Sequence, residues 1–196
     1  MNMSASNQVG RERTRLNFAD AVSKHFAFLG GLGFSEVESL PTLVRYASGD
    51  LEVAIYHGRQ SFEIGFEITR SGTRYSIEEL IRIADPEAAA KYRNFQSTTA
   101  QGIQEGLAQL EGLVKQYGER ALSGDPVFFA ALDQQRKSWA EGYALDVLAG
   151  QMRPKAEAAF RSGDYRQAAD LYERILARLT PAELKKLALA KERAGL

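Results

Sequence analysis

The chain has 196 residues, and its 25 basic and 25 acidic side chains give a formal net charge of zero. No whole-chain field therefore favours nucleic acid or an anionic membrane. The absence of cysteine excludes disulfides, thiolate catalysis and cysteine zinc sites. No run approaches the ~18 apolar residues of a membrane span, and the first residues lack the apolar segment of a secretory signal. We expect a cytoplasmic protein in which residues 1–13 form a disordered leader.

The charges are unevenly distributed along the chain. Residues 150–196 carry ten Lys and Arg against six Asp and Glu, a net charge of +4, which leaves −4 for residues 1–149. Electrostatic steering of a partner and a solvated helical face explain this asymmetry equally well.

The first expected element is a helix of about fifteen residues that includes Leu16 and Leu29 and ends in a glycine cap at Gly30. Three strands follow at about residues 41–47, 51–57 and 61–69. A turn at Ser48-Gly49 would pair Tyr46 with Leu51, and a turn at Gly58-Arg59 would pair Ile55 with Phe62. These registers place the apolar side chains on one core face: Val44, Tyr46, Leu51, Val53, Ile55, Phe62, Ile64, Phe66 and Ile68.

The opposite face of this meander is polar. It carries the residues that we select as a candidate partner-contact surface: Arg45, Glu52, Tyr56, Glu63 and Glu67. Arg45 is expected opposite Glu52 as a cross-strand ion pair. Glu63 and Glu67 lie ~14 Å apart on one strand, too far for the carboxylate pair of a glycosidase.

The rest of the chain reads as helices. Ser76 and Glu79 form a capping box, and Asp85 before Pro86 caps a second short helix. Long helices are expected at about 99–122 and 126–148, the second capped by Asp125, and shorter ones at 153–162, 165–178 and 181–194. The fold class is therefore α+β, with an N-terminal helix, a three-stranded antiparallel meander and a mostly helical C-terminal half. The predicted domains are 14–149, an α+β core with two long helices, and 150–196, a helical hairpin plus a capping helix.

The stretch "PKAEAAFRSGDYRQAADLYERILARLTPAE" resembles a single tetratricopeptide repeat over residues 152–182. The matching small and aromatic positions are Ala156, Gly163, Asp164, Tyr165, Ala168, Tyr172, Ile175 and Pro181. Met152 and Lys155 replace the tryptophan and leucine expected early in the repeat, and no second copy follows. The resemblance implies a hairpin that serves protein contacts, packed on the rest of the chain.

Residues 16–137 look like small uncharacterised bacterial proteins. The matching segments are "FLGGLGF", "LVRYASGDLEVAIYHGRQSFEIGFEI", "EELIRI" and "LVKQYGERALSGDPVFFAALDQQR". Many proteins of that type resemble immunity proteins, which neutralise a toxin by binding it. The resemblance implies a binding role and supplies no catalytic residue.

Residues that carry chemistry are sparse, and we select none as catalytic, cofactor-binding or metal-binding. His25 and His57 read as a helix-surface and a turn histidine, too few for a zinc site. The basic patch of Lys185, Lys186 and Lys191 lacks the interleaved aromatics of a nucleic-acid site. A group of aromatics at near-helical spacing is expected in the core: Phe128, Phe129, Trp139 and Tyr143.

We therefore expect a non-catalytic protein that binds another protein. The most specific version of this hypothesis is that the partner is a toxin. We expect no binding of nucleic acid, membrane or cofactor. One alternative is a small-ligand protein or enzyme with a pocket between sheet and helices. Another is a structural oligomerisation module, which an apolar face exposed on helix 126–148 or 181–194 would favour.

Overall fold

A computed structural model describes residues 16–196, so the leader predicted for residues 1–13 lies outside the described part. The contacts divide the chain into a first unit that ends at Asp133 and a second unit that begins at Gln134. The two are described separately below. The boundary predicted between residues 149 and 150 falls inside helix α8 (Pro126–Ser162).

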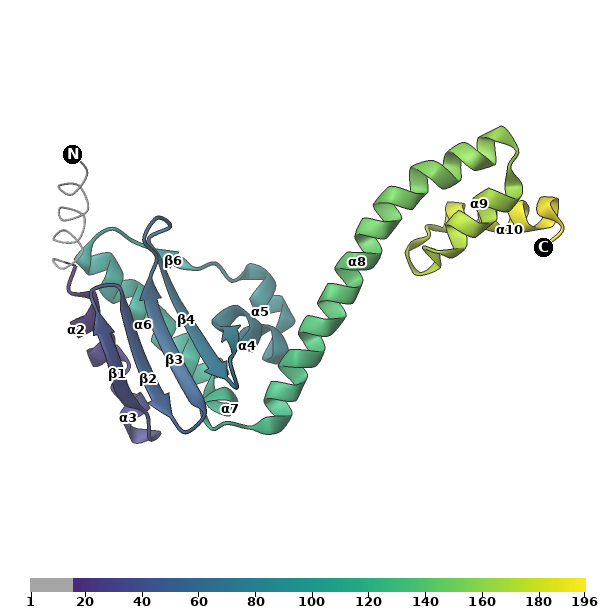
Figure 1. Cartoon of the computed structure of the whole chain (residues 1–196). Coiled ribbons are helices and arrows are strands. Elements are labelled where there is room, and N and C mark those ends of the chain that lie inside the picture. The colour runs from purple at the N-terminus through teal and green to yellow at the C-terminus, as the bar shows by residue number, and fades with distance from the viewer. Residues whose placement is uncertain (1–15) are drawn as a thin grey trace, which may run out of the picture. The chain divides into compact units, whose positions relative to one another are not determined.

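The first unit is an α+β structure built on an antiparallel sheet (Figure 1). The strand order is β1-β2-β3-β4-β5, and β6 also pairs with β4. The bounds are β1 Ser35–Leu40, β2 Leu43–Ser48, β3 Leu51–His57, β4 Glu63–Arg70, β5 Thr73–Ser76 and β6 Phe95–Gln96. The three predicted strands correspond to β2, β3 and β4, whereas β1, β5 and β6 were not predicted. In β1, the register shifts between Glu36 and Glu38, which makes a bulge at Val37.

Both predicted hairpin registers are wrong, and both by an even number of residues. Leu51 pairs with Ser48 rather than with Tyr46, and Ile55 pairs with Phe66 rather than with Phe62. Because side chains alternate along a strand, shifts of two and four residues leave every strand residue on its predicted face. The predicted core residues of the strands are accordingly buried. Phe62 is the exception: it lies before β4 with φ at 53° and is 39% exposed.

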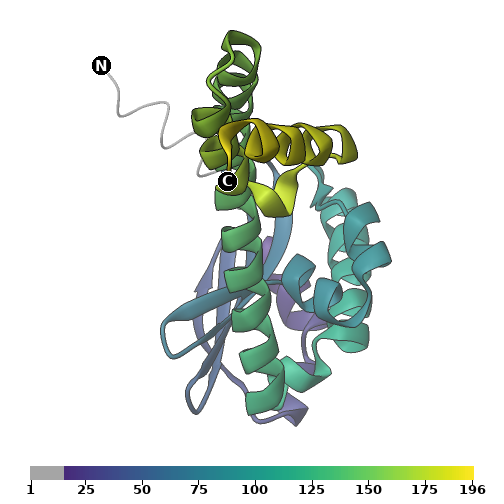
Figure 2. The same ribbon diagram turned by 90° about the vertical axis from the view of Figure 1, so that its right-hand side faces the viewer.

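From residue 16 onward, the first unit also contains the start of α8 and these helices: α2 Phe18–His25, α3 Phe28–Gly31, α4 Ile77–Ala84, α5 Pro86–Lys91, α6 Ala100–Tyr117 and α7 Glu119–Leu122. Figures 1 and 2 show α2 and α6 on the same side of the sheet. The single N-terminal helix expected from the sequence is two helices, because the chain turns at Phe26 and Ala27. This turn lets Phe26 and Leu29 both be completely buried.

Local capping signals predicted several helix starts correctly. Ser76 accepts a hydrogen bond from the backbone N–H of Glu79, whose carboxylate accepts one from the backbone N–H of Ser76. Asp85 accepts from the backbone N–H of Ala88 at the start of α5, and Asp125 does the same for Val127 at the start of α8.

Helix α8 is longer than predicted. It was expected to end at about Leu148, but it continues through Gly150 and Pro154 to Ser162. Its C-terminal part belongs to the second unit, with α9 (Tyr165–Glu173), the short 3-10 helix η1 (Leu176–Arg178) and α10 (Pro181–Ala194). The helices predicted at 153–162 and 165–178 are thus the end of α8 and a shorter α9 followed by η1.

Each unit has its own hydrophobic packing. The first unit's core lies between the sheet and helices α2, α4 and α6, and its last buried member in the chain is Leu132. The second unit packs small residues between helices, with Ala156 and Ala168 completely buried beside Tyr172. Small side chains at these positions let α8, α9 and α10 approach closely.

Candidate partner-contact surfaces

The five residues selected from the sequence lie on the side of the sheet opposite to its apolar core residues. We call this set the outer sheet face: Arg45, Glu52, Tyr56, Glu63 and Glu67. Arg45 is on β2, Glu52 and Tyr56 are on β3, and Glu63 and Glu67 are on β4. All five are partly exposed, so strand alternation brings them to one accessible surface as predicted.

Ala54 holds the middle of the outer sheet face, between Arg45 and Glu67, and Tyr56 lies two residues further along β3. Its cross-strand partner is Gly65, and a Cβ atom added at Gly65 would lie only 2.3 Å from Cζ of the tyrosine ring. The ring therefore lies directly against the glycine backbone. Glycine weakens a strand when it is left uncovered, and a covering aromatic ring compensates for this. The same contact fixes the ring in place on the surface.

The charged residues around Tyr56 are mostly paired within the face. Arg45 Nε lies 3.3 Å from Glu38 Oε2 and 3.7 Å from Glu52 Oε1. Arg45 pairs across the sheet with Ala54 rather than with Glu52, so the predicted ion pair exists but is diagonal. Glu67 Oε2 lies 4.0 Å from Arg74 Nη1. Four carboxylates and two guanidinium groups leave this surface with an excess of negative charge.

Two tyrosines at this surface have a raised pKa, mainly through burial and to a smaller degree through the nearby carboxylates. Burial, and then the carboxylates of Glu67 and Glu63, raise the pKa of Tyr56 to about 12. Burial, and then Glu63, raise the pKa of Tyr92 to about 12. The hydroxyl of Tyr92 donates to Asn94 Oδ1 at 2.6 Å, and the Asn94 amide in turn donates to Glu63. Both phenols stay neutral at physiological pH and remain hydrogen-bonding groups.

The histidines have structural positions that differ from those expected. His25 is half-buried between α2 and α6, with Nδ1 2.8 Å from Glu111 Oε2 and Nε2 3.2 Å from Gln104 Oε1. Lys115, and then His25, hold the pKa of Glu111 below its usual range. His57 is not a turn residue: it ends β3, is 2% exposed and donates from Nε2 to the carbonyl of Ser97 at 2.8 Å.

Residues 16–196 contain no group of three or more His, Asp or Glu side chains placed to hold a metal ion. Between the sheet and α6, the recess bordered by Ile64, Phe95 and Leu110 has a volume of about 10 Å³. That volume admits about one water molecule, so this recess does not favour a ligand pocket between sheet and helices. None of the helices in the described part has the length and apolar character needed to cross a membrane.

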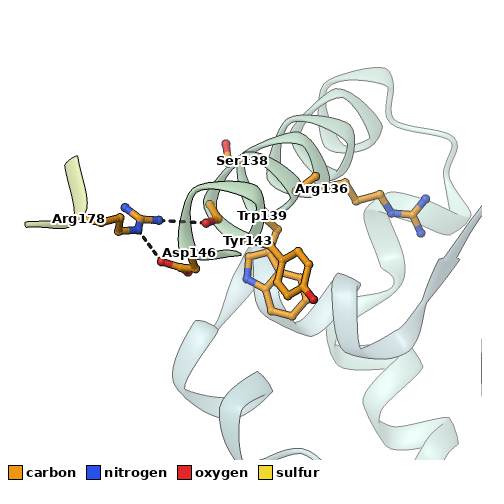
Figure 3. Close-up of a pocket in the computed structure, with 8 residues that line it drawn as sticks. Arg136, Ser138, Trp139, Tyr143, Asp146 and Arg178 are labelled. Atoms are coloured by element: carbon orange, nitrogen blue, oxygen red, sulfur yellow. Dashed lines mark hydrogen bonds and ion pairs between the residues drawn. The ribbon is translucent and has the colours of Figure 1, made fainter. Parts of the chain in front are cut away.

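A second surface lies on α8, at residues that were predicted to lie in the core. Phe128 and Phe129 are buried as predicted, but Trp139 is 69% exposed and Tyr143 is 73% exposed. Figure 3 shows both rings on the same side of α8. Both residues border an open hollow of about 740 Å³. Arg178 donates to Asp146 Oδ1 at 2.6 Å and to the carbonyl of Gly142 at 3.3 Å.

Comparisons with known proteins supply no relative. No family model, curated protein or solved structure matches this chain. The resemblances of residues 152–182 to a tetratricopeptide repeat and of residues 16–137 to immunity-type proteins therefore stay predictions. A function has to be inferred from the two surfaces described above.

The outer sheet face could be predicted from the sequence, but the surface on α8 could not. Strand alternation was sufficient for the first, since one periodicity sorts core from solvent. On α8, near-helical spacing of large aromatics is common to core and contact residues, so spacing alone could not separate them. A usable signal was present in the residues around Trp139, which include Lys137, Ser138 and Glu141, all polar.

Proposed function

We propose that this chain is a non-catalytic protein that binds another protein through the outer sheet face. The most specific version of this proposal is that the chain neutralises a toxin by binding it, as immunity proteins do. The single observation that carries the proposal is Tyr56, which lies against Gly65 on an accessible, acidic sheet face.

The position of Tyr56 suits a binding anchor. Tyrosine is enriched among the residues that contribute most of the binding energy of protein interfaces. Because its ring is already held against Gly65, Tyr56 loses little side-chain freedom when a partner binds. The surrounding carboxylates and Arg45 would form the polar rim of the interface.

The charge of the surface indicates the chemistry of the partner. The outer sheet face and its neighbours Glu38 and Arg74 carry more carboxylates than guanidinium groups, and residues 1–149 have a net charge of −4. We expect a partner protein with a basic contact surface, because complementary charge accelerates association and selects against wrong partners.

The C-terminal helices contribute to the same proposal. The likeness of residues 152–182 to a tetratricopeptide hairpin is supported by complete burial of Ala156 and Ala168 where helices meet, with Tyr172 beside them. Such hairpins serve protein contacts, so this segment would supply a contact surface of its own.

The first experiment is affinity purification from native lysate with three full-length baits. They are the wild type, the face variant E52K/E67K, and the control variant E105K/E119K. Glu105 and Glu119 are exposed on α6 and α7, so the control has the same change in net charge outside the outer sheet face.

A specific partner should be recovered by the wild type and the control and lost from the face variant. The purified partner should then bind Tyr56→Ala about thirtyfold or more weakly than wild type, as expected for an interface anchor. Equal retention of the partner by all baits would rule out the outer sheet face. For toxin neutralisation, the partner expressed alone should stop growth, and co-expression of this chain should restore it.

A further inference from the structure

The residues on either side of Gly65 place two carboxylates beside the Tyr56 ring. Glu63 and Glu67 lie two residues before and two residues after Gly65 on β4, so all three face the same side of the sheet. The Cα atom of each glutamate is therefore ~7 Å from that of Gly65, over which the ring lies. After burial, Glu67 and Glu63 are the causes that raise the pKa of Tyr56, so both carboxylates act on the ring through space.

One side of the Tyr56 ring is open to a ligand. The sheet covers the other side, because a Cβ atom added at Gly65 would lie 2.3 Å from Cζ and 2.7 Å from Cε2 of the ring. Tyr56 is partly exposed, so the surface that solvent reaches lies on the side away from the sheet. The face of an aromatic ring attracts cations through its quadrupole.

Glu63 is held in place next to this ring. The Asn94 amide donates to Glu63 Oε1, and Asn94 Oδ1 accepts from the Tyr92 hydroxyl at 2.6 Å. In the described part of the chain, no basic side chain forms an ion pair with Glu63. Its second oxygen, Oε2, can therefore accept a hydrogen bond from a ligand. Glu67 is less available, since its Oε2 lies 4.0 Å from Arg74 Nη1.

An accessible aromatic face beside a fixed carboxylate without a cation favours a flat, positively charged group. We propose that the partner protein inserts an arginine side chain here, with its guanidinium on the Tyr56 ring and its N–H groups donating to Glu63. This inference rests on the proposed function and specifies the group that the partner presents. Complementary charge selects such a group over neutral and acidic side chains.

Arginine suits this geometry better than lysine does. A guanidinium is planar, so it can stack on a ring while its N–H groups point sideways, in its own plane, to a flanking carboxylate. An ammonium group is a compact charge that is more strongly hydrated, so it is harder to bring onto the ring. Arginine is also enriched, with tyrosine, among the residues that contribute most of the binding energy of interfaces.

The test uses a small probe and the full-length protein, so it does not need the partner. N-acetylarginine amide is titrated at constant ionic strength, and NMR follows the Tyr56 ring and the Gly65 amide. We expect saturable shifts with a Kd of about 10 mM, as for a single side chain. N-acetyllysine amide should bind about threefold more weakly, and uncharged N-acetylcitrulline amide about tenfold or more. An equal response to the lysine or the citrulline probe, or none to the arginine probe, would overturn the proposal.

Variants of the two contact groups separate the ring from the charge. Tyr56→Phe keeps the aromatic face and should bind the arginine probe as the wild type does, whereas Tyr56→Leu should bind it about threefold more weakly. Glu63→Gln keeps an acceptor for Asn94 and removes the charge, which should also weaken binding about threefold. Glu105→Gln changes an exposed glutamate on α6 and is the matched control, with no effect expected. Full affinity in both Tyr56→Leu and Glu63→Gln, with amide spectra that show folded proteins, would refute the site.

This test and the lysate experiment can fail separately. If the probe does not bind but the E52K/E67K bait loses a partner, the arginine site is refuted and the proposed function stands. If the probe binds as described but no partner protein is recovered, the cation site is supported and the proposed function is contradicted.

Discussion

The ring of Tyr56 occupies the space that a side chain at its cross-strand partner Gly65 would need. A Cβ atom at Gly65 would also come within 2.4 Å of the Tyr56 hydroxyl oxygen. The glycine and the ring therefore pack as one unit on the outer sheet face. A substitution at either residue is expected to change the packing of the other.

We expect Gly65→Ala to destabilise the first unit by about 1–3 kcal/mol, because the added methyl group forces the Tyr56 ring out of place. In a Tyr56→Ser background the ring is absent, so the same substitution should be neutral or stabilising, since alanine suits a strand better than glycine. Urea unfolding of the four proteins of this cycle measures the coupling. Independent, additive effects would show that the ring does not depend on the glycine.

Alkaline pH should lower the stability of the fold. The pKa of Tyr56, Tyr92 and Tyr172 is about 12 in the folded chain, against 10.0 for an unperturbed tyrosine. The folded state therefore binds more protons than the unfolded state between these values. The stability that these groups contribute is fully present below pH 10 and is lost as the pH rises from 10 to 12.

The near-ultraviolet absorbance of tyrosinate measures this directly. Some of the eight tyrosines in the sequence should titrate at a higher pH in the folded protein than in denaturant, and we call these tyrosines the late fraction. Tyr56→Phe and Tyr172→Phe should each reduce the late fraction, the first in the outer sheet face and the second between α9 and α8. A late fraction that neither substitution reduces would contradict the assignment.

His57 fixes the short strand β6 to the end of β3. It is buried next to Phe18, with ring centroids 5.8 Å apart, and its Nε2 donates to the Ser97 carbonyl. Phenylalanine keeps the stacking and removes the donor. His57→Phe should therefore cost about 1 kcal/mol and speed hydrogen exchange at the Ser97 amide, which donates to Phe62 O.

Exchange of the amides between β2 and β3 should stay at the wild-type rate in His57→Phe. An unchanged rate at Ser97 would mean that the histidine does not hold β6. Uniformly faster exchange would mean that its role is global rather than local.

The helical packing of the second unit can be tested with two alanines on α8. Ala156 is completely buried against α9 and α10, and Ala158 is exposed two residues later. Ala156→Leu should destabilise this unit by about 1–3 kcal/mol through overpacking, whereas Ala158→Leu should have almost no effect. Thermal unfolding followed by circular dichroism compares them. Equal effects would show that the close approach of the helices does not depend on a small residue.

How far the sequence could predict the fold is clearest in the sheet. Alternation sorted the strand residues onto the correct faces although both registers were wrong, because even shifts preserve the face. Only Phe62 was misplaced, since the predicted tight turn made it a strand residue. The strands β1, β5 and β6 were missed for different reasons. β1 is exposed along most of its length and has no apolar alternation, whereas β5 and β6 have only four and two residues.

In the helical half, local signals predicted helix starts better than helix ends. Helix capping by Ser76, Asp85 and Asp125 involves partners within three residues along the chain. The local sequence is therefore sufficient to predict it. The continuation of α8 through Gly150 and Pro154 is not local, because packing on both sides of these residues overrides their low helix propensity. The exposure of Trp139 likewise depends on which elements pack on α8.

The bulged strand β1 determines how other molecules can approach this sheet. An edge strand with open backbone groups invites another strand to add to it, and in uncontrolled form this leads to edge-to-edge aggregation. Here the extra residue Val37 interrupts the regular spacing, and Glu36 and Glu38 place charges beside it. Strand addition at β1 is thus discouraged. A partner of the sheet is directed to its face, and concentrated solutions of the protein should resist fibril formation as long as Val37 and its flanking glutamates are kept.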